Sequence, residues 1–213
     1  MNRLILSSPL LATSCAVILS AQSSAVSINN EPHHKRLLYT NDLRLWDVEL
    51  PPGQSTPPFV HEYDVATVVI GDGTLNIQRG GEQLSAPSPS LNARGSVIVA
   101  EHTGAAAPYR IENTGTTDYR ALEIENIHEA KQTPPFSISD VVLKPGDAAA
   151  MHQHTGSTII VLISGALEQG GIGGEEPVRI QQPGQWLVLP RFQGHTVAPV
   201  GGSGAHAIEI EVR

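Results

Sequence analysis

The chain has 213 residues, which is long for one small domain and enough for one large or two small domains. Its formal net charge is −8 at pH 7, with 13 Lys and Arg residues against 21 Asp and Glu residues. Because no run or patch of basic residues appears, nucleic acid is excluded as an expected partner. Aromatic residues are only 4% of the chain, so a core built from Val, Ile and Leu is expected, which favours β-structure.

The first 25 residues have the layout of a secretory signal peptide. Arg3 lies near the start, an apolar stretch covers residues 10–19, and the small residues Ser23 and Ala25 follow. The apolar stretch is shorter than the roughly 20 residues that a membrane-spanning helix needs, which favours cleavage over an uncleaved anchor. We therefore predict a secreted or periplasmic protein without membrane attachment after cleavage.

Cys15 is the only cysteine, and it lies inside this segment. A lipid anchor on Cys15 is the alternative, but residues 12–14 lack the usual leucine three positions before the cysteine, and apolar residues continue after it. Cleavage also removes Arg3 and no acidic residue, so the formal charge changes from −8 to −9. The mature chain then has no thiolate, and any metal site must be built from His, Asp and Glu.

Beyond residue 30 the chain consists of short β-rich runs separated by Gly and Pro, which predicts an all-β sandwich or barrel. These runs form two sets that follow the same order along the chain. The matched segments are 45–53 with 138–146, 67–75 with 158–167, 95–100 with 184–189, and 119–125 with 205–211. Four matches in one order indicate an internal duplication that produces two β domains.

The predicted organisation follows from this repeat. The divisions are a signal peptide at 1–25, an N-terminal segment at 26–36, a first domain at 37–128, a linker at 129–135 and a second domain at 136–213. The linker is polar and ends in Pro134 and Pro135. In the last run of each half, Glu alternates with apolar residues, so one face of that strand must pack on a second sheet. We expect the two small halves to pack against each other or across a homo-oligomer.

Three histidines of the second half have a spacing typical of a metal site. His152 and His154 are two residues apart, so on a strand they point to the same face. His195 follows Pro190 by five residues, and a hairpin-linked strand would bring it beside the pair. Three imidazoles leave open coordination positions, which suits a divalent transition metal such as Fe, Mn, Co, Ni, Cu or Zn.

This pattern resembles the cupin superfamily, whose two motifs are G-x5-H-x-H-x(3,4)-E-x6-G and G-x5-P-x-G-x2-H-x3-N. The matching residues are Gly146, His152, His154 and Gly165 in the first motif, and Gly184, Pro190 and His195 in the second. The resemblance covers nearly all of the mature chain and implies two tandem jelly-roll barrels, an arrangement called a bicupin. The sequence departs from the motifs at Thr158 in place of Glu, Phe192 in place of Gly and Pro199 in place of Asn.

The resemblance also has consequences for the site. Three-histidine iron sites occur in cupin dioxygenases, so a metal is permitted here without the motif Glu. Thr158 is then a candidate to hold a metal-bound water or a substrate oxygen, and Phe192 and Trp186 are further candidates to line the site. Trp186 lies in a strand, where a role in the core is the alternative. Glu168 lies beyond the turn and is poorly spaced to replace the missing carboxylate.

The first half has lost the histidine set. Alignment of Thr67 with Thr158 puts His61 at the first histidine position and Tyr63 at the second, and the final strands place Tyr109 against His195. A phenol with a pKa near ~10 is a poor substitute for a neutral imidazole. In an alternative register His61 matches the second histidine and Phe59 the first. Both registers predict that this half binds no metal.

Two functions follow from these observations. The first is a metal-dependent oxygenase, lyase or isomerase that acts on a small molecule. The second is a non-catalytic cupin that binds or stores a small-molecule ligand. The cupin resemblance alone does not decide between them, since function lies in the site rather than in the fold.

Overall fold

A computed structural model describes residues 24–80, 93–101, 107–128, 132–171 and 176–213. In these residues the regular structure is β-strand except for one 3-10 turn, η1 (Ile28–Asn30). The same residues contain no helix with the length and apolar character needed to cross a membrane. The predicted signal peptide lies almost wholly outside the described residues, so its cleavage and the export of the protein stay predictions.

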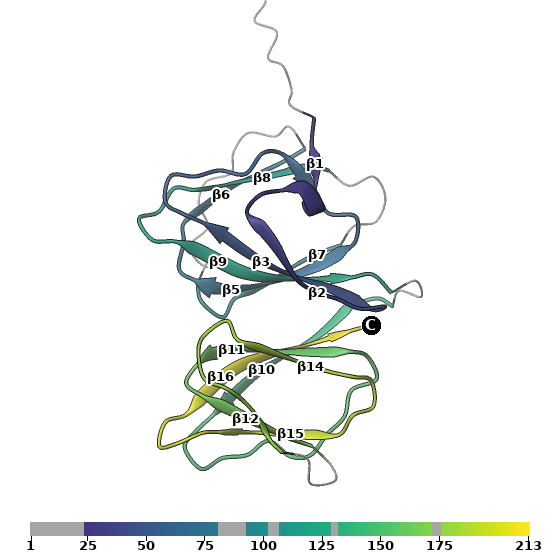
Figure 1. Ribbon diagram of the computed structural model, residues 1–213, viewed down its shortest axis with the longest axis vertical. Helices are drawn as coiled ribbons and strands as arrows, with labels where there is room; N and C mark the ends of the chain where they lie inside the picture. Colours follow the sequence, from purple (N-terminus) through teal and green to yellow (C-terminus); the bar gives the residue numbers. More distant parts are fainter. Residues whose placement is uncertain (1–23, 81–92, 102–106, 129–131, 172–175) are drawn as a thin grey trace, which may run out of the picture.

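The chain forms two β-barrels that lie one above the other in Figure 1, with their larger sheets toward each other. In the first barrel, the larger sheet has the order β2-β3-β9-β5-β7 and the smaller sheet the order β1-β4-β8-β6. Its strands are β1 (Val26–Ser27), β2 (His34–Tyr39), β3 (Leu43–Leu50), β4 (Phe59–Val60), β5 (Asp64–Gly71), β6 (Leu75–Arg79), β7 (Val97–Ala100), β8 (Tyr109–Asn113) and β9 (Tyr119–Asn126).

The second barrel repeats this arrangement with fewer strands. Its larger sheet has the order β10-β16-β11-β14, and its smaller sheet has the order β13-β12-β15. Its strands are β10 (Phe136–Leu143), β11 (Thr158–Ser164), β12 (Leu167–Gly171), β13 (Val178–Ile180), β14 (Trp186–Leu189), β15 (His195–Pro199) and β16 (Ala205–Val212). The all-β jelly-roll prediction is confirmed, whereas the origin of the two barrels by duplication and their proposed boundaries stay predictions.

The two larger sheets face each other across a shared hydrophobic core. Leu122 and Ile124 of β9 belong to the same buried cluster as Ile208 and Ile210 of β16. All four side chains are almost completely inaccessible to solvent. The apolar faces of the two final strands therefore pack on a second sheet as expected, and they do so within one chain. Assembly into a homo-oligomer stays a prediction.

The glutamates that alternate with these apolar residues point the other way, into the barrels. Glu123 and Glu125 on β9, like Glu209 and Glu211 on β16, are all less than 10% exposed. Buried carboxylates require partners, because an isolated charge in an apolar interior is strongly destabilising. In β9 and β16 the apolar residues therefore form the core between the barrels, and the glutamates that alternate with them place two acidic side chains inside each barrel.

Strand pairing corrects one of the four sequence alignments. Thr158 pairs with Glu211, and the residue that pairs with the matching Glu125 is Val65. Val65 is therefore the counterpart of Thr158, and the alignment of Thr67 with Thr158 is wrong by two residues. A shift of two keeps every side chain on its own face of the strand, so the hydrophobic alternation could not reveal the error.

Candidate metal centre

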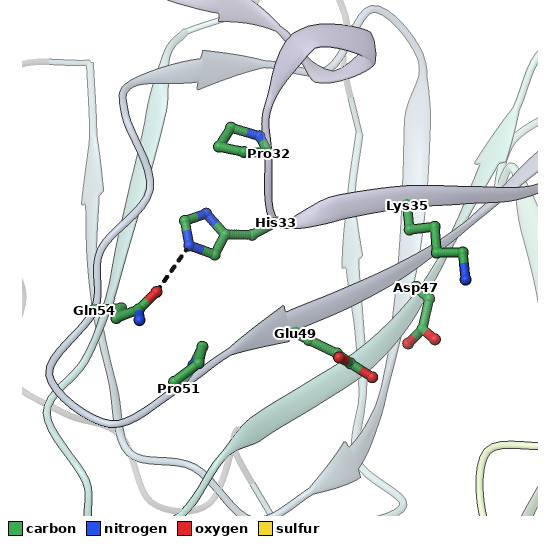
Figure 2. A pocket seen from close by; sticks show the side chains of 7 residues that line it. All are labelled: Pro32, His33, Lys35, Asp47, Glu49, Pro51 and Gln54. Carbon is green, nitrogen blue, oxygen red and sulfur yellow. Dashed lines mark hydrogen bonds between the residues drawn. The ribbon is translucent and has the colours of Figure 1, made fainter.

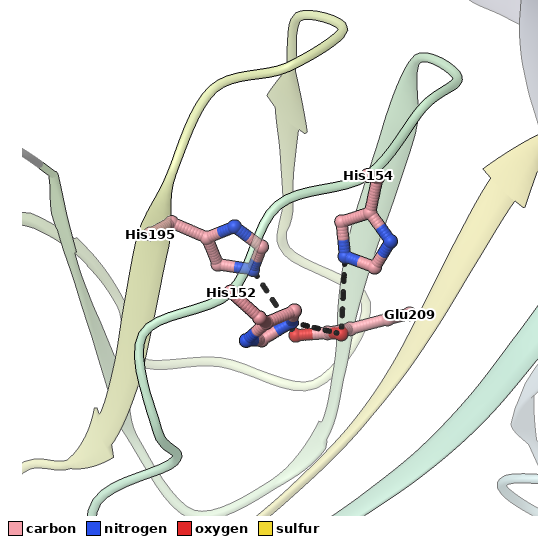
Figure 3. Close-up of side chains that lie close together, drawn as sticks. All are labelled: His152, His154, His195 and Glu209. Atoms are coloured by element: carbon pink, nitrogen blue, oxygen red, sulfur yellow. Dashed lines mark hydrogen bonds and ion pairs between the residues drawn. The ribbon is translucent and has the colours of Figure 1, made fainter.

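The second barrel brings the three predicted histidines together. His152 and His195 form an antiparallel bridge, with backbone N–O distances of 3.1 and 2.9 Å in the two directions. His154 lies on the same segment, two residues further on. The ring centroids are 4.2 Å apart for His152 and His195, 5.0 Å for His152 and His154, and 5.3 Å for His154 and His195. Figure 3 shows the three rings converging from two neighbouring segments.

Glu209 on β16 completes the group, and the sequence analysis missed it. Its carboxylate oxygens lie 3.4 Å from Nε2 of His152, 3.6 Å from Nε2 of His154 and 3.6 Å from Nε2 of His195 (Figure 3). The carboxylate that the motif places in the first part of the barrel therefore comes from the last strand. The only sequence signal for this role was the alternation of Glu with apolar residues.

The spacing of these atoms fits ligands of one metal ion. Two ligands bound at about 2.1 Å and separated by a tetrahedral angle lie about 3.4 Å apart. In the described part of the chain, Nε2 of His154, Nε2 of His195 and Oε1 of Glu209 are buried without a hydrogen-bond partner. Buried polar atoms are normally satisfied, so unpaired atoms that converge on one point favour a missing ion.

The charges around the site favour the protonation states that a metal requires. Burial lowers the pKa of His154, and the neighbouring His195 and His152 lower it further, against the opposing effect of Glu209 and Glu211. Burial alone would raise the pKa of Glu209, but His195 and His152 outweigh this effect and lower it. A neutral imidazole beside an ionised carboxylate is the form in which both groups bind a cation.

A second layer of contacts orients these side chains. Nδ1–H of His152 donates to the carbonyl of Ala150 at 2.9 Å, which leaves Nε2 for the site. Glu211 accepts hydrogen bonds from the backbone N–H and the hydroxyl of Thr155 at 2.8 and 2.7 Å and from the N–H of Gly156 at 2.9 Å. Its other oxygen lies 4.0 Å from Nδ1 of His154. Glu211 therefore stabilises the loop that carries two of the histidines.

The three residues predicted as candidates to line the site lie in different surroundings. Thr158 is fully buried and pairs with Glu211, but its hydroxyl donates to the carbonyl of Gly156 at 3.3 Å. Phe192 is 64% exposed, and its backbone N–H donates to the carbonyl of His154 at 2.8 Å. Trp186 packs against the core between the barrels, as the core alternative for this residue expected, and not against the metal centre.

The first barrel shows what replaced the motif histidines. The structural counterparts are Phe59 with His152, His61 with His154, and Tyr109 with His195. The alternative register is therefore correct for His61, and the match of Tyr109 with His195 holds. Tyr63 stacks under the guanidinium of Arg44, with 4.9 Å from Cζ to the ring centroid, and Thr67 pairs with Glu123. Tyr109 contacts the side chain of Arg79.

A polar groove on the first barrel is separate from the metal centre (Figure 2). It is lined by Pro32, His33, Lys35, Asp47, Glu49, Pro51 and Gln54. Nε2 of His33 lies 3.2 Å from Oε1 of Gln54, and this contact crosses the groove. Asp47 is held by two hydrogen bonds of 2.9 Å from Arg120, so its charge is already balanced. These contacts favour a structural role for the groove.

Comparisons with known proteins agree with this fold. No protein-family model matches the sequence, and no curated protein matches it either. Among solved structures, a cupin 2 conserved barrel domain protein from Leptotrichia buccalis has a TM-score of 0.56 at 16% identity, over 84% of this chain and 88% of that chain. A salicylate 1,2-dioxygenase from Pseudaminobacter salicylatoxidans has a TM-score of 0.63 at 10% identity, over 87% of this chain and 78% of that one.

A third similar structure is the oxalate decarboxylase of Bacillus subtilis, described with Mn(II) centres. Its TM-score is 0.58 at 11% identity, and the match covers 91% of this chain and 79% of that chain. The protein therefore has the fold of the cupin superfamily, as the motifs predicted. More particularly, it has two cupin barrels in one chain, and the second barrel carries a His/Glu group that can hold a metal.

Proposed function

We propose that the second barrel binds one divalent transition metal through His152, His154, His195 and Glu209, and that the protein is a metal-dependent enzyme for a small molecule. The observation that carries this proposal is the convergence of three Nε2 atoms on one carboxylate. Imidazole ligands suit Fe, Co, Ni, Cu and Zn, and a carboxylate adds affinity for harder ions such as Mn. A bound metal would supply a Lewis acid or an oxygen-binding centre.

The chain's own residues would hold the metal and leave one side of it accessible. The side chain of His152 is 36% exposed, whereas His195 and Glu209 are buried at 0% and 3%. A substrate would therefore approach from the side of His152. The buried ligands would keep water from the opposite side and hold the carboxylate of Glu209 ionised. The predicted signal peptide would place this activity in the periplasm or outside the cell.

The similar structures suggest which compounds to test first. One salicylate 1,2-dioxygenase structure was determined in complex with gentisate, and another similar protein is an oxalate decarboxylase. Salicylate, gentisate and oxalate are all small carboxylated molecules. At 10% and 11% identity these proteins share the fold alone with this chain, so the compounds serve as a starting panel.

A binding role without turnover is the second candidate. Glu211 is the other carboxylate that β16 directs towards the histidines. Three hydrogen bonds occupy one of its oxygens, and the other oxygen lies 3.6 Å from Nε of Arg213. A general base needs a free oxygen within reach of its substrate. The engagement of Glu211 therefore favours ligand binding without proton transfer.

Metal analysis and turnover assays separate these functions. The mature protein, purified without a histidine tag, should lose one metal equivalent per chain on the change His152→Ala or His195→Ala. His206→Ala is the matched control, because His206 lies on β16 but pairs with Asp140 at 2.6 Å. No difference in metal content between the parent and both site variants, under any supplied ion, would refute the metal centre.

If metal is bound, oxygen uptake and product formation are measured with salicylate, gentisate, oxalate, small thiols and diketones. Turnover that disappears in His195→Ala supports the enzyme. Saturable ligand binding without turnover supports the second candidate.

A further inference from the structure

The first barrel holds a second buried group of ligand-type side chains, made of His34, His61 and Glu123, which we call the His34 cluster. His34 begins β2, His61 follows β4, and Glu123 lies in the middle of β9. One ligand atom of each residue lies within 4.8 Å of the others. The three residues are only 4–7% exposed, so this group is more enclosed than the centre of the second barrel.

The geometry of the His34 cluster is that of ligands around a common point. Oε2 of Glu123 lies 3.3 Å from Nε2 of His34 and 3.4 Å from Nε2 of His61. In the described part of the chain, Nε2 of His34 and Oε2 of Glu123 have no hydrogen-bond partner although both are buried. The separations again match the about 3.4 Å expected between two ligands of one tetrahedral ion.

Both histidines of the cluster turn their other nitrogen to a carboxylate. Nδ1 of His34 is hydrogen-bonded to Glu31, and Nδ1 of His61 lies 3.3 Å from Oε1 of Glu125. Glu125 in turn accepts a hydrogen bond of 2.9 Å from the indole of Trp46. Metal-bound histidines characteristically donate their second N–H to a carboxylate, which fixes the tautomer with Nε2 directed at the metal.

The charge around the cluster also calls for a cation. Three buried carboxylates, those of Glu31, Glu123 and Glu125, lie around the two imidazoles, and Arg44 is 3.8 Å from Glu125. With neutral imidazoles the carboxylates exceed the single guanidinium by two charges, and unbalanced buried charge is destabilising. One divalent cation balances the excess.

This group repeats the plan of the second barrel only in part. Glu123 stands at the position of Glu209 and His61 at that of His154, whereas Phe59 and Tyr109 replace the other two histidines. His34 comes instead from β2, a strand that is absent from the equivalent sheet of the second barrel. The prediction that the first half binds no metal considered only the motif positions. It could not include His34, which lies outside them.

We propose that the His34 cluster binds one divalent transition-metal ion of the Zn(II) type. Its enclosure and its ligands from β2 and β9 make it a structural site, in which the ion fastens the N-terminal strand β2 to the barrel. Two imidazoles and a carboxylate are a donor set that Zn(II) and Co(II) both accept.

The direct test removes the second-barrel centre first. A His152→Ala/His195→Ala double variant, stripped of metal, is titrated with Zn(II) and with Co(II). We expect one equivalent to bind, with a visible Co(II) absorption band and a rise in melting temperature. Absence of Zn(II) binding at micromolar concentrations in this folded double variant would overturn the proposal. This result is independent of the proposed function, whose failure would leave the parent and the double variant with one equivalent each.

Single substitutions then assign the ligands. Glu123→Gln preserves the size of the side chain, and His34→Gln removes a ring from β2; each should bind no Zn(II) in the double-variant background. His33→Gln is the matched control, because His33 also contacts Glu31, at 2.8 Å, but lies outside the cluster. Circular dichroism checks that each variant is folded. Zn(II) binding that persists at one equivalent in both His34→Gln and Glu123→Gln would contradict this ligand set.

The structural role has its own readout. Removal of Zn(II) from the double variant should increase amide hydrogen exchange in β2 and leave β14 of the second barrel unchanged. Equal exchange in β2 with and without Zn(II) would show that the ion does not fasten this strand.

Discussion

Replacing Phe192 by glycine should stabilise the second barrel relative to replacement by alanine. Phe192 has φ of 61°, in the left-handed region, at the position where the cupin motif has glycine. This conformation costs a non-glycine residue about 1–2 kcal/mol. Glycine avoids that cost but loses about 0.5–1 kcal/mol through its greater freedom in the unfolded chain. From the middle of each range, the Phe192→Gly variant should therefore exceed Phe192→Ala in stability by about 0.8 kcal/mol.

The comparison with alanine isolates the backbone effect. Both variants remove a ring that is 64% exposed, so any loss of packing is common to both. Urea-induced unfolding of the two metal-free proteins measures the difference in unfolding free energy. At an ordinary backbone position the glycine variant would be the less stable of the two. The sign of the difference in unfolding free energy therefore shows whether the backbone at Phe192 is left-handed. Equal stabilities, or a more stable alanine variant, would refute the left-handed backbone at Phe192.

The same pair of variants tests how the turn supports the metal centre. The backbone N–H of Phe192 donates to the carbonyl of His154, and both substitutions retain that N–H. Metal content of the second barrel should therefore match that of the parent in both. A loss of metal in Phe192→Gly alone would show that the extra backbone freedom disturbs His154.

Three further predictions concern the final strand β16. Glu209→Gln should weaken metal binding in the second barrel at least tenfold, because the only carboxylate among the four ligands loses its charge; equilibrium dialysis measures this, and unchanged affinity would remove Glu209 from the ligand set. Glu211→Gln should weaken the same binding about 10–100-fold through loss of support for the histidine loop, and an unchanged affinity would show that Glu211 does not orient the histidines. Ile210→Ala should lower the free energy of unfolding by about 2–5 kcal/mol, since Ile210 is fully buried between the barrels; a change below about 1 kcal/mol in urea unfolding would contradict that packing.

The fold was largely accessible from the sequence because its signals are local. Alternation of apolar and polar residues identified strands, Gly and Pro marked the turns, and three of the four repeat matches agree with the strand pairing. The fourth, which aligned Thr67 with Thr158, failed because β-branched runs look alike when shifted by two residues. Alternation of apolar and polar residues along a strand shows which face each side chain occupies, but it does not determine how that strand is aligned with its neighbour.

The candidate site was accessible only in part. His152, His154 and His195 have a recognisable spacing. The predicted hairpin does not join them, because β11, β12, β13 and β14 lie between the pair and His195, and an isolated bridge from His152 to His195 brings the two segments together. Glu209 is distant in sequence from His152 and His154. It lies beside them because β16 is next to β11, the strand that follows these two histidines in the chain. For Trp186 the sequence left a place in the site and a place in the core open, and the structure puts it against the core, because its nearness to a motif does not determine which face of β14 it occupies.

The sequence by itself determined that this protein is all-β, that it is built from two similar halves and that one half carries a histidine trio. Tertiary structure decided which carboxylates meet the histidines, since alternation places Glu123 and Glu209 inside the barrels but only sheet order selects their neighbours. It also decided that His34, in a segment without motif or repeat, lies beside His61 and Glu123. Contacts between residues far apart in the chain depend on strand order and register, and short-range patterns of residue types do not encode either.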